Sequence, residues 1–323
     1  LDKRRRCLSD RQPYRRRSLY ATARDLHLPM AMTTFSRLIA LGAALFMTTT
    51  ALAAETKGKV LVIVSAANAI PLREGGAHKT GVFLGELTEP ADAMLDAGYE
   101  LVFASPGGIV PTIDEDSKRG QYWRFSKKRL THAKAVLAKL TALGLQNPQK
   151  LEDLASNVDV NLVGFIAVFT PGGHGPLVDL YYKNMFESGE LNEDMGKVLE
   201  YFHRTGKPTG LICHAPATLA AAPKVDGKWI YEGYKVTAIS RLLEFMNEDV
   251  PLMRVIDGHV GEYPDEILRR AGAHYVYNPI PMIPNVVEDR ELMTGQDPFS
   301  AALMGKRFVE KLDAYARKTT KLK

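Results

Sequence analysis

The stretch Gly210-Leu-Ile-Cys-His-Ala-Pro-Ala217 places a thiol beside an imidazole, directly after an apolar run. An abrupt change from a buried strand to a helix at Cys213 would push its side chain into a cleft and bring the sulfur to a helix N-terminus. The partial positive charge there favours thiolate over thiol, and the arrangement matches a nucleophile elbow with cysteine in place of serine. We expect Cys213 to be a nucleophile and His214 to take part in acid–base chemistry, rather than only in a structural hydrogen bond.

Two further stretches carry groups that could serve such a thiol. Thr170-Pro-Gly-Gly-His-Gly-Pro176 follows another apolar run, and its glycines would let backbone N–H groups approach a developing oxyanion. We expect the N–H groups of Gly173 and His214 to form that oxyanion hole. Gly81-Val-Phe-Leu-Gly-Glu-Leu-Thr-Glu-Pro90 puts Glu86 at the start of a helix. Burial there would raise its pKa and suit it to proton transfer; a surface acid that complements the helix dipole is the alternative.

Alternating strand and helix patterns surround these stretches. Near-continuous apolar runs predict strands at 59–64, 99–104, 164–170 and 207–212, and helical spacing occurs at 81–97, 191–202, 215–222 and 304–312. The alternation predicts an α/β fold with a doubly wound, mostly parallel, flavodoxin-like sheet, helices on both faces, and ligands at the carboxyl ends of the strands. Residues 114–160 form a polar helical insertion, either a solvated face or a cap over a site, and 229–239 a hairpin around Glu232-Gly233.

The N-terminal residues differ from the rest of the chain. Residues 1–53 carry ten Lys and Arg side chains against three acids, whereas residues 54–323 carry 32 basic and 34 acidic ones. A short basic stretch from Met32, an apolar run at 38–47 and the small residues of Ala51-Leu-Ala53 together predict a secretory signal peptide at 32–53. We interpret residues 1–31 as an upstream or disordered extension, and 54–323 as one domain that is exported to the periplasm or secreted. The apolar run is too short to span a bilayer as a permanent anchor, so no stable membrane insertion is expected after cleavage; an uncleaved N-terminal anchor is the alternative.

Charge and composition also bear on partners and cofactors. The near-neutral balance of residues 54–323 makes no electrostatic case for nucleic-acid binding. Cys7 lies in the leader, so this part of the chain holds one thiol, Cys213, and its presence in an oxidising compartment favours reactivity over mere packing. Gly107-Gly108 lacks a dinucleotide-binding pattern, so no cofactor is expected. No metal site is expected either, since the remaining histidines show no close ligand spacing: His78, His132, His174, His203, His259 and His274.

Taken together, the cysteine elbow, the Pro-Gly-Gly-His-Gly-Pro turn and the Gly-Val-Phe-x-x-Glu-x-x-x-Pro stretch resemble the ThiJ/PfpI superfamily, which has the class I glutamine-amidotransferase-like fold. The most similar branch contains heat-shock chaperones and glyoxalase III enzymes, and the resemblance covers about residues 58–315. It implies a glutathione-independent glyoxalase, a lyase of the D-lactate dehydratase type that converts the small aldehyde methylglyoxal to lactate. Cys213 would be its nucleophile, His214 the neighbouring histidine and Glu86 the acid–base glutamate, and relatives are often homodimers.

One position departs from the family pattern. The third member of the catalytic group is commonly an acid after the strand that corresponds to Tyr234–Ser240. Arg241 stands at the apparent position here, and Glu244 is the nearest acid. Either Glu244 substitutes for the family's acid, or the triad is incomplete.

Two other functions stay open on the sequence. A thiol hydrolase, either a peptidase or an amidase, would use the same thiolate and oxyanion hole. A glutamine amidotransferase is disfavoured, because His214-Ala215 replaces the usual glycine after the nucleophile. A holdase-type stress chaperone would instead bind unfolded proteins through exposed apolar surface, and such surface at 114–160 would favour it.

Overall fold

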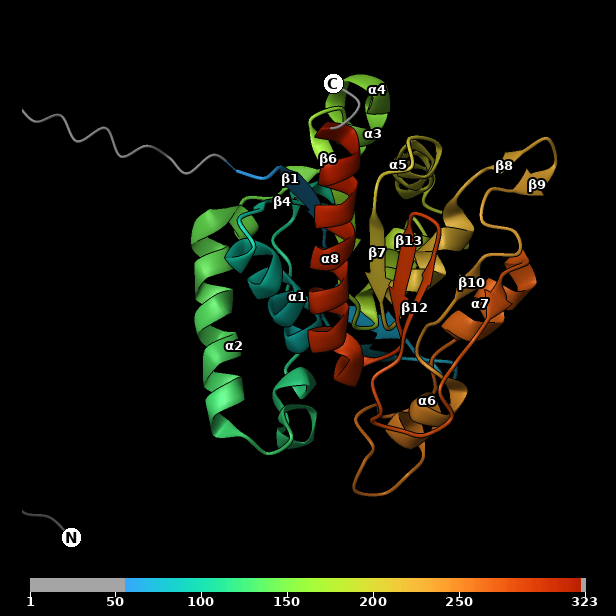
Figure 1. The fold of residues 1–323 in the computed structure, drawn as a ribbon. Coiled ribbons are helices and arrows are strands. Elements are labelled where there is room, and N and C mark those ends of the chain that lie inside the picture. The colour runs from blue at the N-terminus through green and yellow to red at the C-terminus, as the bar shows by residue number, and fades with distance from the viewer. Residues whose placement is uncertain (1–55, 321–323) are drawn as a thin grey trace, which may run out of the picture. The chain divides into compact units, whose positions relative to one another are not determined.

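The computed structural model of the protein describes residues 56–320, so the predicted extension and signal peptide at 1–53 lie outside the described residues. A seven-stranded sheet forms the centre of this part (Figure 1). In chain order its strands are β1 (Lys59–Ile63), β4 (Glu100–Ser105), β5 (Gln149–Lys150), β6 (Phe165–Thr170), β7 (Thr209–Ile212), β12 (Val286–Asp289) and β13 (Leu292–Gly295). Their spatial order is β12-β13-β7-β6-β1-β4-β5, and each pair is parallel except β12–β13. The predicted α/β fold with a mostly parallel sheet is confirmed.

Both faces of the sheet are covered by helices, because successive strand residues point to opposite sides. Val60 and Val62 pack in one core with α1 (Leu84–Asp96) and α8 (Ala301–Thr320). Leu61 and Ile63 pack in a second core with α3 (Leu151–Ser156) and α5 (Glu193–Arg204). All four strand residues are fully buried. This explains why the strand is an unbroken apolar run rather than an alternating one.

The remaining elements lie around this layered centre. The helices are α2 (Lys127–Leu140), α4 (Val158–Asn161), α6 (Arg241–Glu248) and α7 (Pro264–Ala271). Three small two-stranded sheets pair β2 (Ala69–Pro71) with β3 (Ala77–Lys79), β8 (Lys224–Val225) with β9 (Lys228–Trp229), and β10 (Lys235–Val236) with β11 (His274–Tyr275). Among residues 56–320, none of the helices combines the length and apolar character needed to cross a bilayer.

The hairpin predicted at 229–239 is wrong. The antiparallel pair is β8–β9, whose turn is Asp226-Gly227. Both turn residues have positive φ, 52° and 79°, as the tight turn that joins two such strands requires, and Asp-Gly is its usual sequence. After Glu232-Gly233 the chain does not fold back on β9. Instead β10 pairs in parallel with β11, and Tyr231, which lies between β9 and β10, is fully buried in the core.

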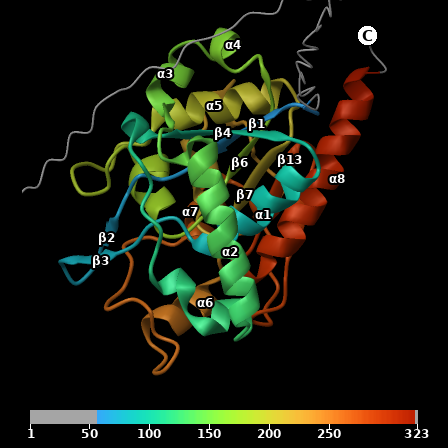
Figure 2. The same cartoon turned by 90° about the vertical axis from the view of Figure 1, so that its left-hand side faces the viewer.

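The polar insertion at 114–160 has both of the roles that its sequence allows. Its longest helix, α2, lies across α1 on the outside of the domain, and Lys127 and Lys128 there are exposed (Figure 2). The residues before that helix turn inwards. Asp114 is buried, and Trp123 is buried with its indole N–H donating to the carbonyl of Ser117 at 2.9 Å. The insertion therefore begins as a cap near the carboxyl ends of the strands and continues as a solvated helix.

Candidate active site

Cys213 sits at a sharp bend where the chain leaves the sheet. Strand β7 ends at Ile212, and a short 3₁₀ helix, Ala215–Ala221, follows two residues later. Cys213 has a φ of +64°, a left-handed conformation that costs a residue with a side chain about 1–2 kcal/mol. Its backbone N–H donates to the carbonyl of Gly295 at 2.9 Å, and its carbonyl accepts from the N–H of Ile239 at 3.0 Å. Hydrogen bonds on both sides hold the strained residue in place, as in a nucleophile elbow.

The surroundings of the sulfur differ from the expected ones. Cys213 is only 2% exposed, and its Sγ atom lies 3.3 Å from Nδ1 of His214. Burial raises the pKa of the Cys213 thiol well above its ordinary value, and the neighbouring Glu86 carboxyl raises it further. The prediction that a helix N-terminus favours the thiolate is therefore wrong for the resting site. Only a short 3₁₀ helix follows the cysteine, so its effect on the pKa of the thiol is small. The loss of water around the sulfur and the adjacent carboxyl of Glu86 determine the direction of the pKa shift.

Glu86 occupies the first turn of α1 and is fully buried beside the cysteine turn. Its Oε2 atom lies so close to Gly172 that a Cβ atom added there would be 2.5 Å from it. Burial raises the pKa of Glu86 to about 8, although the thiol of Cys213 opposes the shift. Neither carboxyl oxygen has a hydrogen-bond partner of ordinary geometry among the described residues. A buried carboxyl in this state can hold or release a proton near neutral pH.

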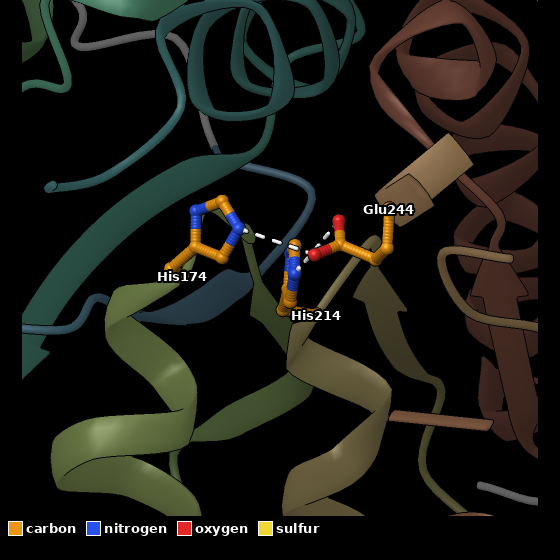
Figure 3. A group of neighbouring side chains, drawn as sticks. All are labelled: His174, His214 and Glu244. Atoms are coloured by element: carbon orange, nitrogen blue, oxygen red, sulfur yellow. Dashed lines mark ion pairs between the residues drawn. The ribbon is translucent and has the colours of Figure 1, made fainter. Parts of the chain in front are cut away.

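Glu244 lies within ion-pair distance of two imidazole rings, those of His214 and His174 (Figure 3). Its Oε1 atom is 3.4 Å from Nε2 of His214, and its Oε2 atom is 3.5 Å from Nε2 of His174. Helix α6 carries this acid, whose side chain is 1% exposed. Arg241, at the position where an acid is common in the family, instead stacks on the ring of Tyr263, 3.3 Å from its centroid. Of the two readings of the sequence, the geometry favours the one in which Glu244 provides the third acid.

The two histidines differ in their electrostatics. Burial lowers the pKa of His214, and the neighbouring His174 lowers it further. Burial also disfavours the charged form of His174, but Glu244 outweighs it and raises the pKa of His174. Burial would raise the pKa of Glu244, yet the two imidazoles hold it well below its ordinary value. His214 is therefore the neutral member, and with its Nε2–H directed to Glu244 it presents the lone pair of Nδ1 to the sulfur of Cys213.

The glycine turn after β6 lies against the cysteine turn. A Cβ atom on Gly172 would come within 2.7 Å of Cβ of Cys213 and within 2.5 Å of the carbonyl of Ile212. Gly173 has a φ of +93°, and a Cβ atom there would be 2.2 Å from the carbonyl of Gly81. Within residues 56–320, neither the N–H of Gly173 nor that of His214 donates a hydrogen bond to another group. Both predicted oxyanion donors are thus available next to the thiol.

A small cavity of about 30 Å³ opens onto these groups. Cys213, His214, His174 and Gly173 line it together with residues from other segments, namely His78, Phe83, Asp114, Asp116, Tyr122, Ile239, Leu243, Asn247, Val255 and Pro298. The rings of Phe83 and Tyr122 meet edge to face at 4.9 Å on its wall. The much larger groove of about 1050 Å³ lies elsewhere and contains none of the cysteine site's residues. The chemistry is therefore located in a closed and narrow space.

Sequence reasoning missed several residues that line this cavity. His174 was grouped with scattered histidines, although its place in the Pro-Gly-Gly-His turn at the end of β6 puts it near the end of the adjacent β7. That adjacency of parallel strand ends is the signal that could have revealed it. Tyr122 and Asp114 come from the insertion, and no local pattern marks them. Asp297, fully buried, also raises the pKa of both Glu86 and Cys213.

Comparison with known proteins adds relatives to this geometry. No protein-family profile matches the chain. The protein/nucleic acid deglycase HchA of Escherichia coli O157:H7 is 26% identical over 261 residues, which are 80% of this chain and 83% of that protein. A solved structure known only by a project code is 28% identical, with a TM-score of 0.60 over 80% of this chain and 98% of the other. Glyoxalase III of Candida albicans, 21% identical, shares the fold with a TM-score of 0.57 over 79% of this chain and 97% of its own.

The similarity to HchA extends over most of both chains. The fold agrees with that of the solved structures over four fifths of this chain. These similarities support the predicted resemblance to the ThiJ/PfpI superfamily and to its branch of heat-shock chaperones and glyoxalase III enzymes.

Proposed function

We propose that the protein is a cysteine-dependent enzyme that converts small reactive aldehydes, with methylglyoxal to lactate as the type reaction and without glutathione. The observation that carries this proposal is the arrangement around one sulfur. Cys213 Sγ lies 3.3 Å from a neutral imidazole, beside the buried carboxyl of Glu86, in a cavity of about 30 Å³. A thiol, a base and a proton carrier in a narrow cavity are the groups that such an isomerisation needs.

The first step is addition of the thiol to the aldehyde carbon. As the S–C bond forms, the thiol proton passes to Nδ1 of His214 and from there to the aldehyde oxygen, which gives a hemithioacetal. His214 accepts this proton more readily because Glu244 stabilises the resulting imidazolium. The N–H groups of Gly173 and His214 stabilise the negative charge on the oxygen before it is protonated. This route avoids the need for a thiolate in the resting enzyme, where the pKa of Cys213 is raised.

The second step moves hydrogen between the two substrate carbons. Glu86 removes the C1 proton, the C1 hydroxyl proton passes to the C2 oxygen, and Glu86 returns its proton to C2. Carbon C1 is thereby oxidised to a thioester while C2 is reduced to an alcohol, so that no external oxidant or reductant is required. Water then hydrolyses the thioester, which releases lactate and restores the thiol. A carboxyl with a pKa of about 8 can both accept and return a proton near neutral pH.

The size of the cavity supports a small free aldehyde over larger substrates. A volume of about 30 Å³ is close to the share of one water molecule in the liquid, so the cavity must widen even for the five heavy atoms of methylglyoxal, and must widen far more for a larger substrate. A peptide or a glycated macromolecule would need the wall at Phe83 and Tyr122 to move before its reactive group reached Cys213. We therefore favour a free aldehyde as the substrate. Hydrolysis of peptides or amides ranks lower, as does action on glycated macromolecules, the activity in the name of the HchA relatives.

A holdase-type chaperone is the second candidate, and exposed apolar side chains on the insertion favour it. Phe125 is 81% exposed, Val160 65% and Leu143 49%. Suppression of client aggregation that is equal in wild-type and Cys213→Ala protein, and lost on replacing these three side chains by serine, would support it.

The enzymatic proposal is tested with purified protein and a panel of methylglyoxal, glyoxal and peptide amides. We expect Cys213→Ser and Glu86→Gln each to reduce turnover of methylglyoxal by about 100-fold or more. Glu89→Gln is the matched control on the same helix. Its side chain pairs with Arg129 at 2.7 Å on the outside of the domain, so near wild-type turnover is expected. Wild-type rates in Cys213→Ser would refute the mechanism.

Export of the protein to the periplasm or outside the cell is a further part of the proposal. It depends on the pattern at 32–53, which lies outside the described residues. Fractionation of cells that express the full chain, combined with N-terminal sequencing of the product, tests it. A product that retains residues 32–53 in the cytoplasm would refute export.

A further inference from the structure

Three potential metal ligands converge beside the thiol from separate segments of the chain. His174 follows β6, His214 follows β7, and Glu244 lies on α6. Their ligand atoms lie within 4.8 Å of one another, and the three residues are 7%, 1% and 0% exposed. Figure 3 shows the carboxylate of Glu244 beside His214, with dashed lines that mark its ion pairs with both imidazoles. Two imidazoles and one carboxylate form the ligand set of several catalytic zinc sites, which keep a further position open.

The distances from the two oxygens of Glu244 to the two imidazoles are long for charge-assisted hydrogen bonds and are compatible with a shared ion. The two Nε2–O separations are 3.4 and 3.5 Å, whereas a charge-assisted N–H···O bond is about 2.7–2.9 Å. Ligand atoms at about 2.0–2.2 Å from a tetrahedral zinc ion lie roughly 3.3–3.5 Å from each other. Moreover, Nε2 of His174, Nε2 of His214 and Oε2 of Glu244 are all buried without a hydrogen-bond partner in the described chain. Unsatisfied buried polar atoms are rare in proteins and suggest a missing ligand.

A second histidine–acid group in residues 56–320 provides the contrast. Glu248, Asp249 and His259 also lie within ligand distance of one another. There the ring atoms of His259 already have partners, since Nδ1 is 2.5 Å from Glu74 and Nε2 is 3.1 Å from Asp249. Asp249 and His259 are partly exposed as well. This group therefore needs no ion to satisfy its polar atoms.

We propose that His174, His214 and Glu244 bind a divalent transition ion of the Zn²⁺ class, and that the bound ion inhibits the thiol chemistry. The binding of the ion is independent of the proposed function, whereas the inhibition of the thiol chemistry rests on it. An ion on Nε2 of His214 leaves the proton of the neutral imidazole on Nδ1, the atom 3.3 Å from Cys213 Sγ. His214 then faces the sulfur as a donor and cannot accept the thiol proton. The cavity lined by both histidines supplies the space for a fourth, solvent-derived ligand.

Binding is measured on the full folded protein after removal of metals with a chelator. Zn²⁺ affinity comes from competition with a chromophoric chelator, and Co²⁺ serves as a spectroscopic probe of the ligands. We expect one ion per chain, with a Co²⁺ spectrum of a nitrogen–oxygen site that lacks a thiolate charge-transfer band. His174→Gln and Glu244→Gln should each weaken Zn²⁺ binding by about 100-fold or more, whereas His174→Asp, which restores a ligand atom, should weaken it less.

Two further variants separate this proposal from the enzymatic one. Cys213→Ser should bind Zn²⁺ as wild type does even though it has no activity, and His259→Gln should also bind normally. In wild type, one equivalent of Zn²⁺ should abolish methylglyoxal turnover, and chelator should restore it. Absence of stoichiometric binding to the wild-type protein, a thiolate band in the Co²⁺ spectrum, or unchanged affinity in folded His174→Gln would each overturn the assigned site. Binding without inhibition would overturn the regulatory half alone.

Discussion

The sulfur of Cys213 lies 3.3 Å from Nδ1 of His214, its immediate neighbour in the chain. Adjacent residues rarely present their side chains to each other in a strand, where successive side chains point to opposite faces. The contact occurs because Cys213 adopts a φ of +64° just after β7, which reverses the direction of the following side chain. A strained backbone conformation thus creates the pair on which the proposed chemistry depends.

Replacing Glu244 by glutamine tests whether this acid acts through His214. The amide keeps the shape of the side chain but cannot stabilise an imidazolium, so we expect kcat for methylglyoxal to fall by about 100-fold or more with little change in KM. Arg241→Gln is the matched control on the same helix, since the arginine stacks on Tyr263 away from the cysteine. Turnover within a few-fold of wild type is expected for it. A larger loss in Arg241→Gln than in Glu244→Gln would contradict the assignment of the third acid.

Glu86 should couple folding stability to pH. Its pKa of about 8 in the folded protein exceeds the ordinary value of 4.5, so the folded chain retains a proton that the unfolded chain has lost. The stability from this group is fully present below pH 4.5 and is lost as pH rises through about 8. Relative to Glu86→Gln, the free energy of unfolding of wild type should decrease by up to about 1.4 kcal/mol per pH unit between these values. Urea unfolding at a series of pH values measures it.

Urea unfolding of the wild-type and Glu86→Gln proteins is also compared with Cys213→Ser present in both, because the thiol and Glu86 influence each other's pKa. The pH-dependent difference should persist in that background, since burial is the main cause of the raised pKa. Parallel stability curves for the glutamate and glutamine proteins would show that Glu86 has an ordinary pKa.

Gly172→Ala tests the close contact between the two turns. A Cβ atom at this position would lie 2.5 Å from Oε2 of Glu86 and 2.7 Å from Cβ of Cys213, so the acid and the thiol must separate. We expect methylglyoxal turnover to fall by about 100-fold, because a displacement of about 1 Å in a catalytic group has effects of this size. Gly164→Ala is the control. Gly164 lies just before β6, the strand that Gly172 follows, and its added methyl group meets no other atom within 4 Å. Comparable activity in the two variants would show that the contact is unimportant.

Tyr122 should limit the size of the substrate. Its ring meets Phe83 at 4.9 Å and forms part of the wall of the small cavity. Tyr122→Ala should enlarge that cavity and raise kcat/KM for phenylglyoxal relative to methylglyoxal by about tenfold or more. Phe125→Ala, in the same segment but 81% exposed, should leave the ratio unchanged. An unaltered preference in Tyr122→Ala would place the substrate entrance elsewhere.

Local patterns were sufficient for much of the fold. The runs at 59–64 and 164–170 predict buried strands because both faces of a parallel sheet are covered, so each strand is apolar throughout. The cysteine turn after 207–212 and the position of Glu86 in the first turn of a helix follow from strand-to-helix spacing. Strands β5, β12 and β13 and the hairpin at Asp226-Gly227 were not predicted. Each of these strands is only two to four residues long, too short for a long apolar run, whereas Asp-Gly is itself a local hairpin signal.

Local residue patterns identified Cys213 as the candidate nucleophile, with His214 beside it and Glu86 at the start of α1, because each lies at a turn or helix start that nearby residues specify. Folding is what brings Glu244 and His174 to these residues, because three segments of the chain meet there through the packing of the sheet and α6. The protonation states of the Cys213 thiol and the neighbouring carboxyls likewise depend on the folded structure. Whether a thiol or a carboxyl is charged depends on how much water and which charges surround it. Those surroundings exist only once the chain has folded around Cys213.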